Sequence, residues 1–411
     1  MSVWDGLPVP DERAVSIRLK RSAERPLRKG HPWIFDQGIE HQNREGAPGD
    51  LALLFSAKRK LLGLGLYDPR SPIRVKMLHR GKSQPIDDDF FARRLHDAIE
   101  VRAGLEAAGT TGYRVVHGEN DGLPGFVVDR YGETLVVKLY SAIWVPRLRQ
   151  LIPPLLERLR ARRLVLRFSR RLQGHPEDCH GLSEGQILLG PLLDGPIAFQ
   201  ENHLTFLADP IRGQKTGFFL DQRDNRARVG TLAKGKRVLN VFSYSGGFSL
   251  YAARGGASEV ISLDSSQPAL ETAEQIFARN HDHPAIEACR HELLCADAFA
   301  GMVELETSGR RFDLVIIDPP AFAKKSAEVK TAYTAYARLM RLGLKLLVPG
   351  GDLVFASCSS RVPSGEFRER MLQVAAQAGR PLQDLEVTTH GIDHPIDFPE
   401  GAYLKCLFAQ A

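Results

Sequence analysis

The feature that most constrains the fold is a regular alternation of apolar strands and helical stretches in the second half of the chain. Strand-like runs stand at "RVLNVF", "EVISL", "FDLVIID" and "GDLVFAS", with helical stretches between them. Such alternation is typical of βα units and of a parallel, doubly wound sheet. We therefore expect a Rossmann-like α/β domain over residues 196–411. In these sheets, ligands bind outside the carboxyl ends of the strands.

Two smaller domains are expected before it. Residues 1–80 hold short alternating segments separated by glycines, prolines and charged turns, which predicts a small β-rich domain. Residues 81–195 combine two strands in "GFVVDRYGETLVVKLY" with two helical stretches, the second interrupted near Pro153–Pro154. This favours a central mixed α/β domain. The proline- and glycine-containing stretch Leu188–Pro196 marks its expected boundary.

Composition excludes several classes of protein. The chain has 411 residues, which suggests two or three domains, and no apolar run reaches the roughly 18 to 20 residues that span a bilayer. The N-terminal stretch has acidic residues and prolines and no apolar core, so we do not interpret it as a secretory signal. Five cysteines without paired spacing favour a reducing, cytoplasmic location.

The charge is concentrated at one end. Residues 1–80 hold fifteen Lys and Arg against nine Asp and Glu, so the whole net charge of +6 falls there. A small basic domain beside a neutral body suggests an anionic partner, of which nucleic acid is the commonest. An ordinary solvated surface would look the same, so charge alone leaves both interpretations open.

A nucleoside-cofactor site is predicted where the regular pattern begins. The strand "VLNVF" runs into Gly246–Gly247, the next strand ends at Asp264, and the third is followed by Asp297. Glycines permit a tight turn, and the two acids can accept hydrogen bonds from ribose hydroxyls and an adenine amino group. Neither G-x-G-x-x-G nor G-x-x-x-x-G-K-[ST] occurs, which disfavours a dinucleotide and excludes a P-loop. The residues adjoining these positions complete the predicted cofactor set: Phe242, Ser243, Ser265 and Ala298.

The ends of the fourth and fifth strands carry the residues expected to do chemistry. "VIIDPPAF" places Asp318 at a strand end and follows it with Pro319–Pro320 and Phe322. "FASCSS" places Cys358 at the edge of the same cleft. We predict that the prolines and Phe322 contact a planar substrate, as aromatic side chains do with extruded bases.

These motifs resemble those of a known family. "NVFSYSGGFS", "DPPAF" and "SCSS" match class I S-adenosylmethionine-dependent RNA methyltransferases. Together with "KTGFFLDQRDNR", "DHPIDFPEGAYLKCL" and the N-terminal "RKGHPWIFDQGIE", they look like the bacterial 23S ribosomal RNA cytosine-5 methyltransferase family. The resemblance covers essentially the whole chain. It implies an N-terminal PUA RNA-binding domain, S-adenosylmethionine as cofactor and ribosomal RNA as partner, either free or in an assembling particle.

The resemblance also implies roles for particular residues. Phe219, Gln222 and Arg223 would close over the cofactor, although a packed helix N-terminus is an equal alternative. Cys358 would add as a thiolate to carbon 6 of cytosine, which raises electron density at carbon 5, and Asp318 would stabilise the ring at N3 or handle a proton. Many RNA cytosine-5 methyltransferases carry a second cysteine in a "PC" pair at the fourth strand. This chain has Pro319–Pro320 there, so the proton-abstracting base stays unidentified.

Competing interpretations remain at this stage. A methyltransferase acting on a guanine nitrogen would not need Cys358, and a non-catalytic RNA-binding or ribosome-assembly factor would need none of these side chains. Trp33 fits a core position better than an RNA-stacking one. The stretch "HDHPAIEACRHELLC" has no ligand spacing typical of zinc, so no metal is predicted. The oligomeric state, monomer or homodimer, is open.

Overall fold

The computed structural model describes residues 3–323 and 325–411. They form two compact units. The first holds the described residues up to His203 together with Ala208–Leu220 and Ile392–Phe398, and the second holds Leu204–Leu207, Asp221–Gly391 and Pro399–Ala411. The division into domains 1–80, 81–195 and 196–411 stays a prediction. Among the described residues, no helix combines the length and hydropathy needed to cross a bilayer.

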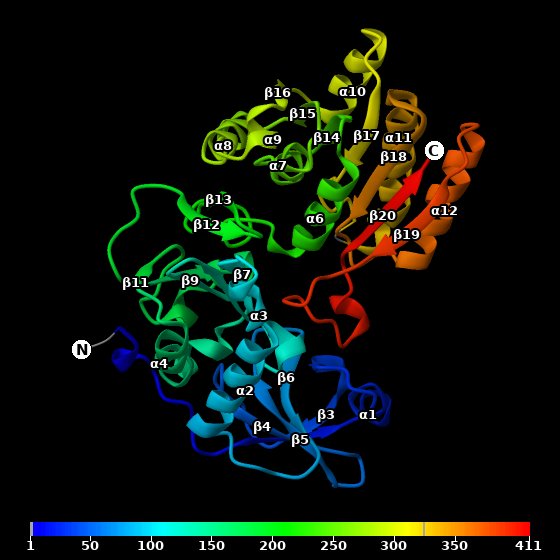
Figure 1. Cartoon of the computed structure of the whole chain (residues 1–411). Coiled ribbons are helices and arrows are strands. Elements are labelled where there is room, and N and C mark those ends of the chain that lie inside the picture. Colours follow the sequence, from blue (N-terminus) through cyan, green and yellow to red (C-terminus); the bar gives the residue numbers. More distant parts are fainter. Residues whose placement is uncertain (1–2, 324) are drawn as a thin grey trace. The chain divides into compact units, whose positions relative to one another are not determined.

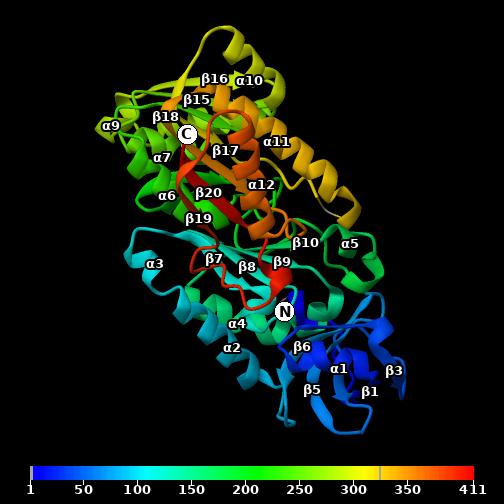
Figure 2. The same ribbon diagram turned by 90° about the vertical axis from the view of Figure 1, so that its right-hand side faces the viewer.

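The first unit begins with a six-stranded sheet in the order β2-β6-β5-β4-β1-β3. Alternate residues of the first strand are fully buried, which is the period-two pattern expected of a sheet with one covered face. One short helix, α1 (Arg21–Arg28), follows that strand (Figure 2). The strands are β1 (Val15–Leu19), β2 (Trp33–Phe35), β3 (Ile39–Gln42), β4 (Leu51–Phe55), β5 (Leu61–Tyr67) and β6 (Ile73–Arg80). The β-rich character expected of this region is confirmed.

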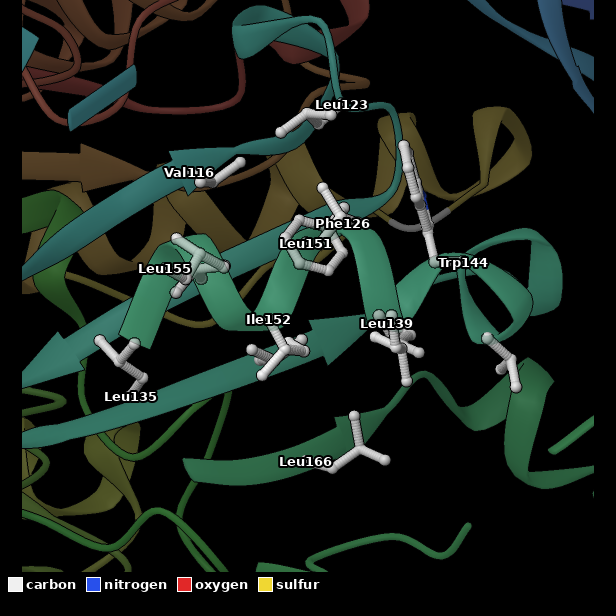
Figure 3. Packing of buried hydrophobic residues seen from close by; sticks show 14 of the residues in the cluster. Val116, Leu123, Phe126, Leu135, Leu139, Trp144, Leu151, Ile152, Leu155 and Leu166 are labelled. Atoms are coloured by element: carbon white, nitrogen blue, oxygen red, sulfur yellow. The ribbon is translucent and has the colours of Figure 1, made fainter. Parts of the chain in front are cut away.

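A second sheet of the first unit has the order β11-β10-β9-β8-β7. Only β9 and β10 pair in parallel, and the helix α4 (Leu148–Leu159) connects them. Figure 3 shows the apolar side chains of this helix directed onto the strands. The elements are β7 (Gly112–His117), β8 (Phe126–Tyr131), β9 (Thr134–Leu139), β10 (Arg163–Phe168) and β11 (Ile187–Leu189), with α2 (Asp88–Val101), α3 (Gly104–Ala107) and α5 (Arg170–Gln173).

The interruption predicted near Pro153–Pro154 is wrong. Both prolines lie inside α4, which continues to Leu159. Each proline removes one backbone hydrogen bond. The neighbouring side chains of Leu151, Ile152 and Leu155 are fully buried, so packing against the sheet offsets the lost bonds and keeps the segment helical.

The second unit is built on a seven-stranded sheet in the order β16-β15-β14-β17-β18-β20-β19. All neighbouring strands pair in parallel except β20, which is antiparallel to both of its neighbours. The strands are β14 (Arg237–Val241), β15 (Glu259–Asp264), β16 (Arg290–Cys295), β17 (Phe312–Ile317), β18 (Leu347–Ser357), β19 (Gln383–Thr388) and β20 (Lys405–Gln410). Strand β12 (Ile197–Glu201) and strand β13 (Leu204–Ala208) precede them in the chain.

Helices cover both faces of this sheet (Figure 1). Most residues on β14, β15, β17 and β18 are buried, as expected of parallel strands with helices on both sides. One helical layer consists of α6 (Arg223–Leu232), α7 (Gly247–Arg254), α8 (Gln267–Ala278) and α9 (Pro284–Glu287), and the other of α10 (Ala298–Thr307), α11 (Val329–Leu346) and α12 (Ser364–Gln377). The predicted Rossmann-like, doubly wound fold is confirmed. The chain order reverses at β14, which has β15 on one side and β17 on the other, so the ligand-binding edge lies beyond the carboxyl ends of these strands.

Candidate active site

The turn after β14 has an unusual backbone. Phe242 and Tyr244 adopt φ angles of 61° and 48°, in the left-handed region, and Gly246 follows at 75°. Bulky residues in that region cost on the order of 1–3 kcal/mol each and persist where the surroundings hold them there. The backbone N–H of Ser243 donates to Leu263 O at 3.0 Å, which fixes this turn beside β15. The strain is concentrated at the position predicted for a cofactor.

The two glycines of the turn are required by packing within the protein. A Cβ on Gly246 would lie 2.8 Å from the Cβ of Ala273 on α8. A Cβ on Gly247 would lie 2.9 Å from Cδ of Arg226 on α6. Because neither glycine has a side chain, α7 can lie close to both α8 and α6.

Two serine hydroxyls of the same turn fit a polar ligand. Ser243 and Ser245 are 6% and 4% exposed, and neither Oγ has a hydrogen-bond partner among the described residues. Buried hydroxyls are nearly always paired, with protein, water or a bound molecule. The turn therefore offers hydroxyl groups that a nucleoside cofactor with polar substituents would satisfy.

Asp264, at the end of β15, is hydrogen-bonded to the turn after β14. Its Oδ2 accepts a hydrogen bond from Tyr244 N at 2.8 Å, and its Oδ1 accepts one from Ser266 N at 2.9 Å. Ser265 lies between them and is exposed. Each carboxylate oxygen has a second acceptor position, so Asp264 can hold the turn and still accept from a ribose.

Asp297 also has a structural role. It is the N-cap of α10, and its Oδ1 accepts from Phe299 N at 3.0 Å and Ala300 N at 3.1 Å. Ala298, the first helical residue, is buried. Asp297 itself is exposed at the carboxyl end of β16, and one of its carboxylate oxygens caps the helix.

Asp318 and Cys358 follow two adjacent parallel strands, β17 and β18. The Cys358 Sγ donates to Asp318 Oδ1 across 3.8 Å, and both residues are half-buried. Pro319 is buried, while Pro320 is exposed. The fold thus brings together the two residues predicted to carry the chemistry, although forty positions separate them in the chain.

Gln222 contacts Asp318. Its Nε2 donates to Asp318 Oδ2 at 2.9 Å, and its Oε1 accepts from Asn225 Nδ2 at 2.6 Å. Thr388 on β19 in turn donates to Asn225 Oδ1 at 2.5 Å. Gln222 is 1% exposed, so this buried chain of hydrogen bonds holds one oxygen of the Asp318 carboxylate. A role in positioning Asp318 was not foreseen from the sequence.

The other two residues predicted to close over the cofactor belong to different units. Arg223 is buried at the start of α6, and its Nε donates to Asp224 Oδ1 at 3.0 Å. Phe219 belongs to the first unit, where its ring lies under the Lys215 ammonium at 4.6 Å. Phe322, which was predicted to contact the substrate, has its ring 5.2 Å from that of Tyr336, so it packs against α11 along one side.

Two buried groups beside Cys358 were missed. Tyr336 shares a hydrogen bond with Ser357 at 2.9 Å, and burial raises the pKa of this phenol to about 12, so it stays neutral. Lys405 is 1% exposed, and burial lowers its pKa to about 8. The sequence signal that could have identified Lys405 is its position inside the apolar run "AYLKCLF", because buried lysines are rare.

The histidine- and cysteine-containing stretch is structural. Burial lowers the pKa of His291 to about 4, its ring stacks on Phe277 at 3.7 Å, and its Nε2 lies 2.8 Å from Ser262 Oγ. Burial also raises the pKa of Cys289 to about 11. Within residues 3–323 and 325–411, no group of three or more His, Cys, Asp or Glu is arranged to hold a metal.

The first unit carries a basic pocket between α1 and the turn after β4. Its lining residues are Arg21, Glu24, Arg25, Arg28, Lys29, Ser56, Ala57, Lys58 and Lys60. Six of these are cations and one is an anion, so the pocket concentrates the charge surplus of residues 1–80 on one surface. Such a pocket attracts phosphate groups. Trp33 lies elsewhere in this unit, half-buried, and its Nε1 donates to Glu119 Oε1 at 2.9 Å.

Comparison with known proteins agrees with this geometry. A family model described as S-adenosylmethionine-dependent methyltransferase matches residues 159–400, and a PUA-like domain model matches residues 17–80. A Deinococcus radiodurans protein named "Ribosomal RNA large subunit methyltransferase" is 45% identical over 98% of this chain and 99% of its own. An Aeromonas hydrophila protein named "Ribosomal RNA large subunit methyltransferase I" is 37% identical over 97% of this chain and 100% of its own.

Solved structures share the fold. A candidate SAM-dependent methyltransferase of Streptococcus mutans superposes with a TM-score of 0.79 at 21% identity, covering 96% of this chain and 100% of its own. A candidate methyltransferase solved in complex with SAH gives 0.80 at 21% identity, with the same coverage. Strand order, strained turn, family model and full-length relatives agree: the chain belongs to the S-adenosylmethionine-dependent methyltransferases and carries a PUA-like domain.

Proposed function

We propose that this enzyme methylates carbon 5 of a cytosine in 23S ribosomal RNA through a covalent adduct with Cys358. The observation that carries the proposal is the pair of Cys358 Sγ and Asp318 Oδ1, 3.8 Å apart at the ends of adjacent strands. The names of the full-length relatives support large-subunit ribosomal RNA as the substrate, and such a substrate would place the enzyme in the cytoplasm.

S-adenosylmethionine, when bound, supplies an activated methyl group. The turn with Ser243 and Ser245, the carboxylate of Asp264 and that of Asp297 would hold it, because they line successive strand ends of the second unit. Phe242 and Ser265 adjoin those positions. These assignments rest on placement at the ligand-binding edge of the sheet.

Cys358 is the proposed nucleophile. Its thiolate forms a bond to carbon 6 of the cytosine, and the displaced π electrons make carbon 5 the nucleophile toward the methyl group. After methyl transfer, a base takes the proton of carbon 5, the electron pair of that bond re-forms the carbon 5–carbon 6 double bond, and the thiolate leaves carbon 6. A cysteine suits both steps because a thiolate adds readily and departs readily.

Asp318 is proposed to bind the ring edge. A carboxyl group 3.8 Å from the attacking sulfur is close enough to meet N3 of a base seated over Cys358. A proton shared between Asp318 and N3 would neutralise the negative charge that thiolate addition places on the ring. Pro319, Pro320 and Phe322 would flank the base after it has left its stack.

A nucleoside digest tests the base assignment. The protein is incubated with labelled S-adenosylmethionine and large-subunit ribosomal RNA that lacks its methyl groups, and the labelled nucleoside is identified by mass spectrometry. Label in 5-methylcytidine is the expected result. Label in a methylated guanosine would retain the cofactor and overturn the thiolate mechanism.

A pair of cysteine variants tests the nucleophile. Cys358→Ala should abolish methyl transfer. Cys289→Ala is the matched control, since burial raises the pKa of that thiol to about 11 and makes it a poor nucleophile. Wild-type turnover by a folded Cys358→Ala enzyme would refute the covalent route.

A further inference from the structure

Lys405 is a buried cation next to the proposed nucleophile. It opens strand β20 and lies directly opposite Ser357, the residue before Cys358, in the antiparallel pair of β18 and β20. Lys405 is 1% exposed, so its ammonium group is held inside the protein at the end of β18.

The hydrogen bonds of Lys405 enclose the Cys358 segment. Its Nζ donates to the backbone oxygen of Ser359, the residue after Cys358, and to Tyr403 O at 3.0 Å. An ammonium group has three donors, so one N–H remains after these two carbonyls are satisfied.

No carboxylate among the described residues forms an ion pair with Lys405. Another buried lysine of this chain, Lys76, shows the usual arrangement: it is 5% exposed and its Nζ lies 2.8 Å from Asp68 Oδ2. Buried charges are normally paired in this way because desolvation is costly. Burial lowers the pKa of Lys405, and an ionised Cys358 would raise it.

Cys358 in turn needs a cation. Asp318, on β17, receives its hydrogen bond, and a carboxylate at that distance disfavours a thiolate. Tyr336, from α11, stays neutral because burial and the charges of Cys358 and Asp318 raise its pKa to about 12. Lys405, on β20, is a buried cation that favours the ionised sulfur, since an ionised Cys358 in turn raises the pKa of Lys405.

We propose that Lys405 is the positioning residue that keeps Cys358 as a thiolate, acting as its counter-charge and fixing the backbone on the far side of the sulfur. The inference rests on the proposed function, in which Cys358 attacks the base. When the thiol ionises, its proton leaves to solvent and Lys405 keeps its own three. The ammonium form is present at neutral pH, because burial lowers the lysine pKa only to about 8.

Alkylation kinetics test the proposal without RNA or cofactor. The full-length protein is treated with iodoacetamide between pH 5 and pH 10, and the rate at Cys358 is measured by peptide mass spectrometry. The exposed Cys295 serves as the reference thiol in the same sample. In the wild type, the pH at which the alkylation rate of Cys358 is half its maximum should lie below about 8.5, the pKa of a free cysteine. A midpoint at or above that value overturns the proposal even if no variant folds.

Three variants isolate the charge. Lys405→Met should slow alkylation of Cys358 at pH 7 by tenfold or more and move its midpoint up by about 1–3 units, the range for loss of an adjacent opposite charge. Lys405→Arg should restore most of the rate. Lys345→Met is the control, since Lys345 is an exposed lysine of the same unit. An unchanged profile in folded Lys405→Met overturns the proposal.

The alkylation test of Lys405 and the nucleoside digest that tests the proposed function can fail independently of each other. If the digest gives 5-methylcytidine while Lys405→Met leaves the alkylation profile unchanged, the inference about Lys405 fails and the function stands. If the Cys358 midpoint rises as expected while the digest gives methylguanosine, the counter-charge is supported and the covalent function fails.

Discussion

Replacement of Gln222 by leucine distinguishes two roles for this side chain. The sequence assigned Gln222 to the cofactor, whereas the structure places its Nε2 2.9 Å from Asp318 Oδ2. Leucine is close to glutamine in size and cannot donate, so Gln222→Leu removes this bond with little change in packing. It also leaves Asn225 Nδ2 without its acceptor at Gln222 Oε1.

The magnitude follows from the charge and burial of the partners. A hydrogen bond to a charged group contributes about 1.5–3 kcal/mol, and the lower end applies here because Asp318 is partly exposed. Since about 1.4 kcal/mol corresponds to a factor of ten, kcat should fall about tenfold. The unpaired Asn225 amide, on a residue 2% exposed, should lower the free energy of unfolding by about 1–3 kcal/mol.

Steady-state methyl transfer decides between the roles. With RNA saturating, Gln222→Leu should lower kcat and leave KM for S-adenosylmethionine within about twofold of wild type, which is the pattern for a group that acts only in the transition state. Gln377→Leu, at an exposed position of α12, is the control. A rise in KM for S-adenosylmethionine with kcat unchanged would refute the positioning role and restore the cofactor assignment.

Three further predictions concern charge. Arg25→Glu with Lys58→Glu, in the basic pocket, should weaken RNA binding and lower the slope of log K against log salt by about 0.7 for each lost contact to single-stranded RNA; an unchanged slope would remove the pocket from the interface. Burial lowers the pKa of His291 to about 4, so its neutral form stabilises the fold above pH 6.5 and this contribution is lost as the pH falls toward 4. In urea titrations, the stability advantage of the wild type over His291→Gln should therefore shrink by roughly 3 kcal/mol between pH 6.5 and pH 4. An unchanged advantage would show that His291 titrates normally. Arg102→Met should cost about 3–5 kcal/mol in urea unfolding, since it leaves Asp121, 2.8 Å away, as an unpaired buried charge, and a loss below about 1 kcal/mol would contradict that account.

Local pattern was enough to predict the framework of the second unit. Apolar periodicity identified the strands, and the rule that ligands bind at strand ends predicted the proximity of Asp318 and Cys358, which lie 3.8 Å apart. It failed where distant packing decides conformation. The prolines of α4 predicted an interrupted helix, but burial of this helix against the sheet of β7 to β11 keeps it continuous.

The sequence by itself determined the doubly wound fold, the glycine turn after its first strand and the choice of candidate nucleophile, because each depends on residues close together in the chain. The tertiary structure decided what surrounds that nucleophile. Strand β20 inserts beside β18, and this alone brings Lys405 to Ser359, 46 positions earlier, just as α6 brings Gln222 to Asp318 across 96 positions. Such contacts depend on which strand enters the sheet next to which, and no periodicity along the chain encodes that choice.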